Sequence, residues 1–334
     1  MKRIISASLV CISIGLSSTA YSSADNMDID TEVVMTAAER GDVESQKKAG
    51  SMYMLGVGVE QSFEKSFDWF LKAAKQGDPQ AQYWIGAFYE KGNGVEKDLL
   101  EAISWYEKSA TKGYEESQKA LGQFYSALAM VYLHGLAGKP KNIETAINNL
   151  NKAVEYGDPE AQYNLAVLYA NGNGVEQNYE EAVRLYQLSA AQGVVQAQYN
   201  LGGLYLEGIG VDQNIKMAVD WYEKAANNGY AQAQTNLGLI FSKGEGLLQD
   251  YEVARAWFLK AAEQGEMVAQ RELSSMYLFG RGVSMDFVKA HMWANIAASN
   301  GYDIEQRDVI AEYMTPEEIS RAQKMAAEWV AEHQ

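Results

Sequence analysis

The amino-acid sequence predicts an all-α protein, a solenoid of about seven helix–turn–helix repeats followed by capping helices. The first observation is a glycine that recurs every 36 residues, with one interval of 44, at Gly41, Gly77, Gly113, Gly157, Gly193, Gly229, Gly265 and Gly301. The second is that a similar apolar pattern follows each of these glycines. The third is that only four prolines accompany 29 glycines, which suits helices that end on glycine. A lone helix pair cannot bury its apolar face, so stacked neighbours are expected to share one continuous core.

The first residues, 1–24, are expected to be a signal peptide and no part of the fold. Two basic residues precede the apolar stretch 4–16, which is too short to anchor stably in a bilayer. Small residues follow this stretch, and cleavage after Ala20 or after Ala24 fits them. We therefore expect a bacterial protein that is exported to the periplasm or secreted.

Residues 25–33 are then expected to form a flexible N-terminus ahead of the repeats, which occupy 34–302. Cys11 is the only cysteine and lies within the apolar stretch. A processed chain would therefore have no disulfide, no thiolate chemistry and no cysteine metal site.

The chain is strongly acidic, with a formal charge of −16 and a sequence pI near 4.7. Such a surface repels phosphate backbones and anionic lipid, and no later segment looks apolar enough to span a membrane. The expected partner is therefore a protein or a peptide, and neither a nucleic acid nor a membrane. No cofactor is expected, and the sequence leaves the oligomeric state open.

The clearest copy of the repeat runs over residues 77–113. Its first helix carries an apolar face at helical spacing, made of Ala81, Ile85, Phe88 and Tyr89. Its second helix carries the matching face, made of Ala102, Trp105, Tyr106, Ser109 and Ala110. A Gly-x-Gly-Val turn joins the two helices, and a glycine ends the second one.

Gly86 lies inside the predicted first helix, where glycine costs about 1 kcal/mol relative to alanine. Its recurrence indicates a close approach of the two helices, with the tryptophan ring expected over the gap. The residues assigned to this repeated framework are Gly86, Trp105, Gly113, Gly202, Trp221, Gly229, Trp257 and Gly265.

The repeat motif resembles that of the Sel1-like repeat family, which is related to the tetratricopeptide repeats. The resemblance rests on three motifs. The first helix carries Ala-x-x-x-Leu-Gly-x-x-Tyr as Ala197, Leu201, Gly202 and Tyr205, and the turn carries Gly-x-Gly-Val as Gly208 to Val211. The second helix carries Ala-x-x-Trp-x-x-x-Ala-Ala as Ala218, Trp221, Ala225 and Ala226. The resemblance covers residues 34–302 and implies a right-handed superhelical solenoid that scaffolds complexes or binds proteins.

The third repeat, 113–156, breaks the period with eight extra residues. Two registers compete there, because Leu121-Gly122 and Leu128-Ala129 both fit the motif. Eight residues equal about two helical turns, so the first helix of this repeat is expected to lengthen. The insertion is either a functional feature or a tolerated change in local curvature.

The C-terminal segment, 303–334, is expected to cap the last repeat. Thr315-Pro316-Glu317-Glu318 forms a capping box with proline at the first helical position. The helix that follows carries Ile319, Ala322, Ala326 and Trp329 on one face, which suits a cover for the exposed end of the core.

Catalysis is not expected. His134, His291 and His333 are far apart and show no metal-ligand spacing. Cysteine-rich relatives in the family resembled here have been described as penicillin-binding or β-lactamase-like. Ser-x-x-Lys matches occur, among them those that start at Ser45 and Ser62, but no Lys-Thr-Gly or Ser-Asp-Asn completes such a site.

By analogy with tetratricopeptide repeats, first helices line a concave binding surface. The residues expected to face inward lie two before the motif leucine, namely Lys47, Tyr83, Tyr163, Tyr199, Thr235 and Arg271, and two after it, namely Ser51, Ala87, Val167, Gly203, Leu239 and Ser275. The tyrosines either grip a bound segment or pack between helices. A third set, Asn164, Asn200 and Asn236, either bonds a peptide backbone or satisfies neighbouring helix groups.

The leading hypothesis is therefore a non-catalytic scaffold that binds a protein or peptide on its concave face. An immunity protein that neutralises a periplasm-targeted toxin and a secreted factor that engages host proteins are alternatives. A β-lactamase-like activity is the enzymatic alternative.

Overall fold

A computed structural model describes residues 30–244, 246–301 and 305–333, and within these ranges the chain forms helices and turns without a strand. The predicted signal peptide, 1–24, lies outside the described residues. The chain divides into two compact units. Unit 1 holds the described residues up to Leu128 together with Glu155–Gly157, and unit 2 holds Ala129–Val154 together with the described residues from Asp158 onward.

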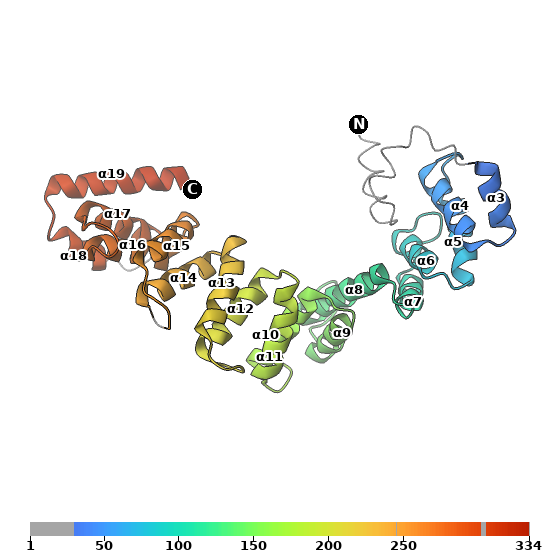
Figure 1. Ribbon diagram of the computed structural model, residues 1–334, viewed down its shortest axis with the longest axis horizontal. Coiled ribbons are helices and arrows are strands. Elements are labelled where there is room, and N and C mark those ends of the chain that lie inside the picture. The colour runs from blue at the N-terminus through green and yellow to red at the C-terminus, as the bar shows by residue number, and fades with distance from the viewer. Residues whose placement is uncertain (1–29, 245, 302–304, 334) are drawn as a thin grey trace. The chain divides into compact units, whose positions relative to one another are not determined.

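The helices follow one another in pairs, one pair for each repeat (Figure 1). Those that begin in unit 1 are α3 (Thr31–Glu39), α4 (Val43–Leu55), α5 (Phe63–Lys75), α6 (Pro79–Lys91), α7 (Leu99–Ala110) and α8 (Glu115–His134), of which α8 continues into unit 2. Those that begin in unit 2 are α9 (Ile143–Glu155), α10 (Pro159–Asn171), α11 (Tyr179–Ala191), α12 (Val195–Glu207), α13 (Ile215–Asn227), α14 (Ala231–Lys243), α15 (Tyr251–Glu263), α16 (Met267–Phe279), α17 (Phe287–Ser299), α18 (Glu305–Ala311) and α19 (Pro316–His333). In the regular repeats the first helix packs on the second helix of its own repeat and on the second helix of the repeat before.

The pair α6 and α7 shows why these residues form this unit. Asp78 caps α6 by accepting the backbone N–H of Ala81 at 2.7 Å, and proline follows it at the first helical position. Gly92 ends α6 in the left-handed conformation at φ +73°. A Cβ added to Gly94 would lie 2.4 Å from the carbonyl carbon of Phe63, so the second glycine of the turn lets it rest on the start of α5 in the preceding repeat.

The close helix approach expected at Gly86 is present, but the predicted covering ring is wrong. A Cβ on Gly86 would lie 2.7 Å from ring carbons of Tyr106, the residue after Trp105. The same holds in the three other regular repeats that carry glycine at this position, where Phe70, Tyr222 and Phe258 lie over Gly50, Gly202 and Gly238. Trp105 lies half-buried beside this contact, with the Lys108 ammonium 4.1 Å from its ring centroid.

A buried glutamine fastens each regular repeat to its neighbour, a feature that the sequence analysis did not identify. Gln234 donates to the carbonyl of Ala226 at the end of the preceding second helix, at 3.0 Å. Its own carbonyl oxygen accepts from Gln264, 30 residues later, at 2.8 Å. The corresponding oxygens of Gln82 and Gln198 are buried without a hydrogen-bond partner.

The third repeat has a longer first helix, because α8 runs for 20 residues where α6 and α10 run for 13. Its turn also differs. Ala137 is a non-glycine residue at φ +51°, and a Cβ added to Gly138 would meet nothing within 4 Å. Asn149, at the tryptophan position of α9, donates its side-chain amide to the carbonyl of Thr145 at 2.7 Å.

The two ends of the described chain are helical as well. At the N-terminal end, α3 begins at Thr31, within the segment 25–33 that was expected to be flexible, and it packs on α4. Residues 25–29 lie outside the described residues.

At the C-terminal end, Thr315 and Glu318 exchange side-chain-to-backbone hydrogen bonds of 2.9 and 3.3 Å, which is the expected capping box. Helix α19 packs on α17 (Figure 1). Its Ala322 and Ala326 are buried in the core, and Trp329 meets Trp293 edge to face with ring centroids 5.3 Å apart.

Candidate functional site

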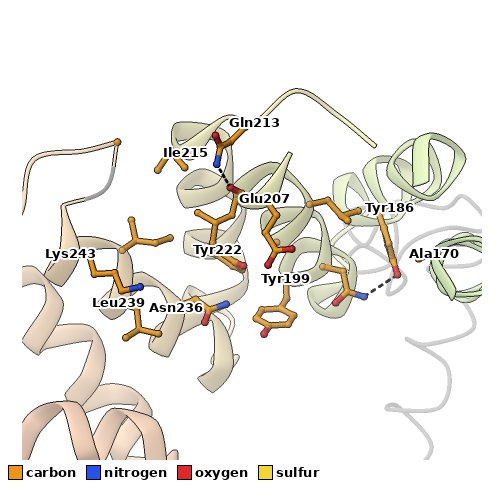
Figure 2. Close-up of a pocket in the computed structure, with 16 residues that line it drawn as sticks. Ala170, Tyr186, Tyr199, Glu207, Gln213, Ile215, Tyr222, Asn236, Leu239 and Lys243 are labelled. Atoms are coloured by element: carbon orange, nitrogen blue, oxygen red, sulfur yellow. Dashed lines mark hydrogen bonds between the residues drawn. The ribbon is translucent and has the colours of Figure 1, made fainter. Parts of the chain in front are cut away.

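A groove of about 770 Å³ opens in unit 2, between the repeats that begin at α12 and α14. Residues of α12 and α14 line most of it, and α10, α11, α13 and the turn at Gly246 contribute the rest. Figure 2 shows these side chains around the open space. Of the residues expected to face a partner, Tyr199, Asn200, Gly203, Asn236 and Leu239 lie here together.

The groove is open at Gly203 because this residue has no side chain. At the equivalent position α10 carries Val167 and α14 carries Leu239. The neighbouring Gly202 is required by packing, since its Cβ would lie 2.8 Å from the Tyr222 ring. A Cβ on Gly203 would lie 3.5 Å from the Tyr222 hydroxyl, an ordinary contact, so packing does not require glycine there.

Three tyrosines, Tyr186, Tyr199 and Tyr222, form the aromatic part of the groove. The Tyr199 ring lies 5.6 Å from the ring of Tyr222 and 5.0 Å from that of Tyr230, centroid to centroid. Tyr199 is half-buried, whereas Tyr222 is 2% exposed. The pKa of Tyr222 is raised to about 12, mainly by burial, with smaller contributions from Tyr199 and from the negative charge of Glu207.

The asparagines bond tyrosine hydroxyls of the preceding repeat. Asn200 donates its side-chain amide to the Tyr186 hydroxyl at 3.1 Å, and Asn236 hydrogen-bonds the Tyr222 hydroxyl. Of the two roles open to them, the structure shows this second one, the pairing with neighbouring helices. Each amide still has a carbonyl oxygen that accepts hydrogen bonds.

Glu207 and Lys243 supply charge to the groove. Glu207 is the last residue of α12, and it adds its charge to the negative end of a helix whose last turn holds no basic residue. Figure 2 shows its side chain directed toward Tyr199 and Tyr222, with Lys243 on the side of Asn236 and Leu239. Both charged side chains are exposed.

The other residues predicted for unit 2 do not share one surface. Thr235 is 5% exposed and bonds the carbonyl of Ala231, so its assignment to a binding face is wrong. Tyr163 packs on Tyr186 at 6.0 Å, and Arg271 pairs with Glu272. Asn164, Val167 and Ser275 are half-buried and lie outside the groove lining.

In unit 1 the predicted residues are mainly structural. Tyr83 packs against Tyr106 and Tyr114, both at 5.6 Å, and Ala87 is 7% exposed, so Ala87 does not present a binding surface. Lys47 bridges Glu44 and Asp78 at 2.7 and 3.0 Å, and thereby ties α4 to the cap of α6. In both units the predicted tyrosine column packs on second-helix tyrosines of the same repeat.

Sequence reasoning missed Tyr186, Tyr222, Glu207 and Lys243 as lining residues. Tyr222 follows Trp221 directly and belongs to the same apolar pattern, so the sequence assigns it to the core. Glu207 and Lys243 stand at the ends of their helices, where charged residues are common. The sequence marked the groove only through Gly203, because other repeats carry a side chain at this position.

The Ser-x-x-Lys pairs have structural roles. The Ser62 hydroxyl caps α5 by accepting the backbone N–H of Lys65 at 3.3 Å, and the Lys65 ammonium lies 5.3 Å from the Tyr53 ring centroid. The Ser45 backbone donates to Asp42 at 2.8 Å. In the part of the chain that the structure describes, no group of three or more His, Cys, Asp or Glu could hold a metal ion.

Over residues 30–244, 246–301 and 305–333, no helix combines the length and the apolar character needed to cross a bilayer.

Paired helices, a ring over each helical glycine and a groove between repeats define a helical-repeat protein of the α-solenoid class. The chain belongs to the Sel1 repeat family, which matches it at residues 43–78, 79–114, 118–158, 159–194, 195–230, 231–266 and 268–302. The seven matches confirm the resemblance inferred from the motif. Sel1 repeats generally form a non-catalytic scaffold for protein interactions.

Among the solved structures similar to this chain, two share 34% sequence identity with it. One is a protective antigen present in uropathogenic Escherichia coli strains, which displays the Sel1-like repeat fold; identity is 34% over 91% of this chain, with a TM-score of 0.57. This chain spans 64% of the length of that structure. The other is a Sel1 repeat protein from Oxalobacter formigenes, 34% identical over 86% of this chain and 81% of its own, with a TM-score of 0.50. A comparison with curated proteins gives no match.

Proposed function

We propose that this protein is an exported, non-catalytic scaffold that holds a segment of another protein in the groove between α12 and α14. The observation that carries the proposal is Gly203, a helical glycine that opens the groove although packing does not require it. Glycine inside a helix costs about 1 kcal/mol relative to alanine. Access to the groove is a benefit that offsets this cost.

The walls of the groove suit a protein segment. Tyr199 is half-buried and already held by two neighbouring rings, so little of its freedom would be lost on binding. Rigid tyrosines of this kind supply large contact areas at protein interfaces. The volume of about 770 Å³ accommodates a few side chains.

Export rests on the predicted signal peptide at 1–24. It is supported by the similar Escherichia coli protein, which is a protective antigen. The expected location is the periplasm or the cell exterior. Fractionation of cells that express the full chain tests this, and deletion of residues 4–16 is expected to keep the protein in the cytoplasm. Recovery of the undeleted chain in the cytoplasm alone would contradict export.

Site-specific photo-crosslinking tests the groove. A photoreactive residue at Leu239 is expected to crosslink the partner, whereas one at the exposed Lys260 on α15 is expected to give no product. Gly203→Leu fills the opening with the side chain that α14 carries at this position, and should reduce the crosslinked product at least tenfold. Ser275→Leu makes the same change at the equivalent position of α16, outside the groove, and should leave the product unchanged. Equal products from the two leucine variants, with unchanged helicity, would refute the assignment.

A further inference from the structure

We propose that the groove receives an arginine side chain of the bound segment, with the guanidinium stacked on Tyr199 and paired with Glu207. This inference rests on the proposed function and names the chemistry of the partner. It depends on the hydrogen-bonding groups, the charge and the shape of the groove.

The groove offers mainly hydrogen-bond acceptors. Asn200 donates an N–H group to the Tyr186 hydroxyl and also hydrogen-bonds Tyr163, and Asn236 hydrogen-bonds the Tyr222 hydroxyl. The carbonyl oxygen of each amide can accept a hydrogen bond, and the Glu207 carboxylate is an acceptor only. A ligand that brings donors and no acceptors satisfies this set best, and a guanidinium has five N–H donors and no acceptor.

The local charge also favours a cation. Glu207 stands at the negative end of α12 and is directed toward Tyr199 and Tyr222 (Figure 2). No ion pair to Glu207 occurs among the residues that the structure describes. The whole chain carries −16, so a basic partner is also attracted over longer distances.

The shape distinguishes arginine from lysine. The half-buried Tyr199 ring borders the opening above Gly203, and a planar guanidinium can stack on such a ring while it pairs with a carboxylate. The ammonium of lysine is compact and strongly hydrated, so it gains less from this arrangement. The space left by Gly203 receives the aliphatic part of the arginine.

Lys243 gives the proposal an internal control. It lines the same groove on the α14 side, opposite Glu207 (Figure 2). A bound cation is attracted by Glu207 and repelled by Lys243. Neutralising each residue with an amide should therefore change the affinity for a cation in opposite directions.

The test uses the full chain and end-capped Gly-Arg-Gly peptides, with binding followed by the NMR signals of the Asn200 and Asn236 side-chain amides. The matched probe replaces arginine with citrulline, which has nearly the same shape and no charge. We expect saturable shifts with arginine, at least fivefold weaker binding of the citrulline and lysine peptides, and no binding of the glutamate peptide. Glu207→Gln should remove the preference for arginine over citrulline, and Lys243→Gln should strengthen arginine binding about threefold. Gly203→Leu should abolish the shifts.

Equal binding of arginine and citrulline peptides, or a preference for the glutamate peptide, would overturn the arginine assignment. If Gly203→Leu still removed the Leu239 crosslink in that case, the groove would remain the binding site and only its occupant would be wrong. If the arginine shifts were normal but the crosslink survived Gly203→Leu, the proposed scaffold function of the groove would fail.

Discussion

Two adjacent glycines in α12 allow a direct test of the packing described above. Gly202 and Gly203 lie next to each other in one helix, and replacing either with alanine gives the same gain in helix propensity. They differ in what a methyl group would meet. At Gly202 it would lie 2.8 Å from the Tyr222 ring, and at Gly203 it would lie 3.5 Å from the Tyr222 hydroxyl.

The expected magnitudes follow from these distances. Gly203→Ala should gain up to about 1 kcal/mol from helix propensity because nothing has to move. Gly202→Ala has the same gain but forces the buried Tyr222 ring to shift, and overpacking of this kind typically costs about 1–3 kcal/mol. The two variants should therefore differ by about 1–3 kcal/mol in the free energy of unfolding. For a cooperative unit of the size of unit 2, each kcal/mol corresponds to about 2–4 °C in melting temperature.

Thermal melts followed by far-UV circular dichroism measure this difference. Gly203→Ala should melt at or above the parent chain, and Gly202→Ala should melt clearly below Gly203→Ala. In a Tyr222→Leu background the gap should narrow, because the ring that Gly202 accommodates is gone. If Gly202→Ala melted as high as Gly203→Ala, the close contact with the ring could not be the reason for the glycine.

Three further predictions concern buried polar groups. Gln234→Leu should lower the urea midpoint by the equivalent of about 1–3 kcal/mol, because the Ala226 carbonyl loses its hydrogen-bond donor. Asn228→Gln should raise the midpoint by the equivalent of about 1 kcal/mol, because it gives the unpaired Gln198 side-chain oxygen a donor. An unchanged midpoint in Asn228→Gln would show that the unpaired oxygen does not destabilise the fold. His291 is 2% exposed, and burial holds its pKa below the usual 6.5, with a smaller contribution from Arg307. As the pH falls below 6.5, the unfolded chain therefore binds a proton at His291 that the native chain does not bind. The stability contributed by the neutral, buried His291 is thus fully present above pH 6.5 and is lost as the pH falls below this value. A melting temperature that falls equally between pH 7 and pH 5 in the parent and in His291→Gln would contradict this.

The period of the glycines was enough to predict the paired helices and the turns, and the capping box at Thr315 was enough to predict the C-terminal helix, because each of these depends on local spacing. The ring over Gly86 could not be assigned in the same way. Trp105 and Tyr106 are adjacent, both suit an apolar face, and only the angle between the two helices decides which ring reaches the glycine.

The groove was predicted less well than the fold. The tetratricopeptide analogy placed Thr235 and Ala87 on the same surface as Tyr199, but both are buried, because side chains at one helical position differ in how far they reach. The buried glutamines recur at the repeat spacing, but a polar residue near the start of a helix is predicted from the sequence to be exposed. Their role depends on carbonyls eight residues earlier and on partners 30 residues later, and these meet only in the folded chain.

The position of Gly203 recurs once in every repeat, and the residues found there include Ser51, Val167, Leu239 and Ser275. In the regular repeats that carry a helical glycine, the ring contact between the paired helices is made at the preceding residue. The residue at the glycine position therefore maintains the packing of the two helices, and the residue after it can vary and change the shape of the surface. A single substitution such as Leu239→Gly would lengthen the groove toward α16, and it would also remove the packing of Leu239 against the core cluster that includes α15 and α16. Selection could reshape recognition in this protein by changing side-chain size at one position per repeat, while the architecture stays constant.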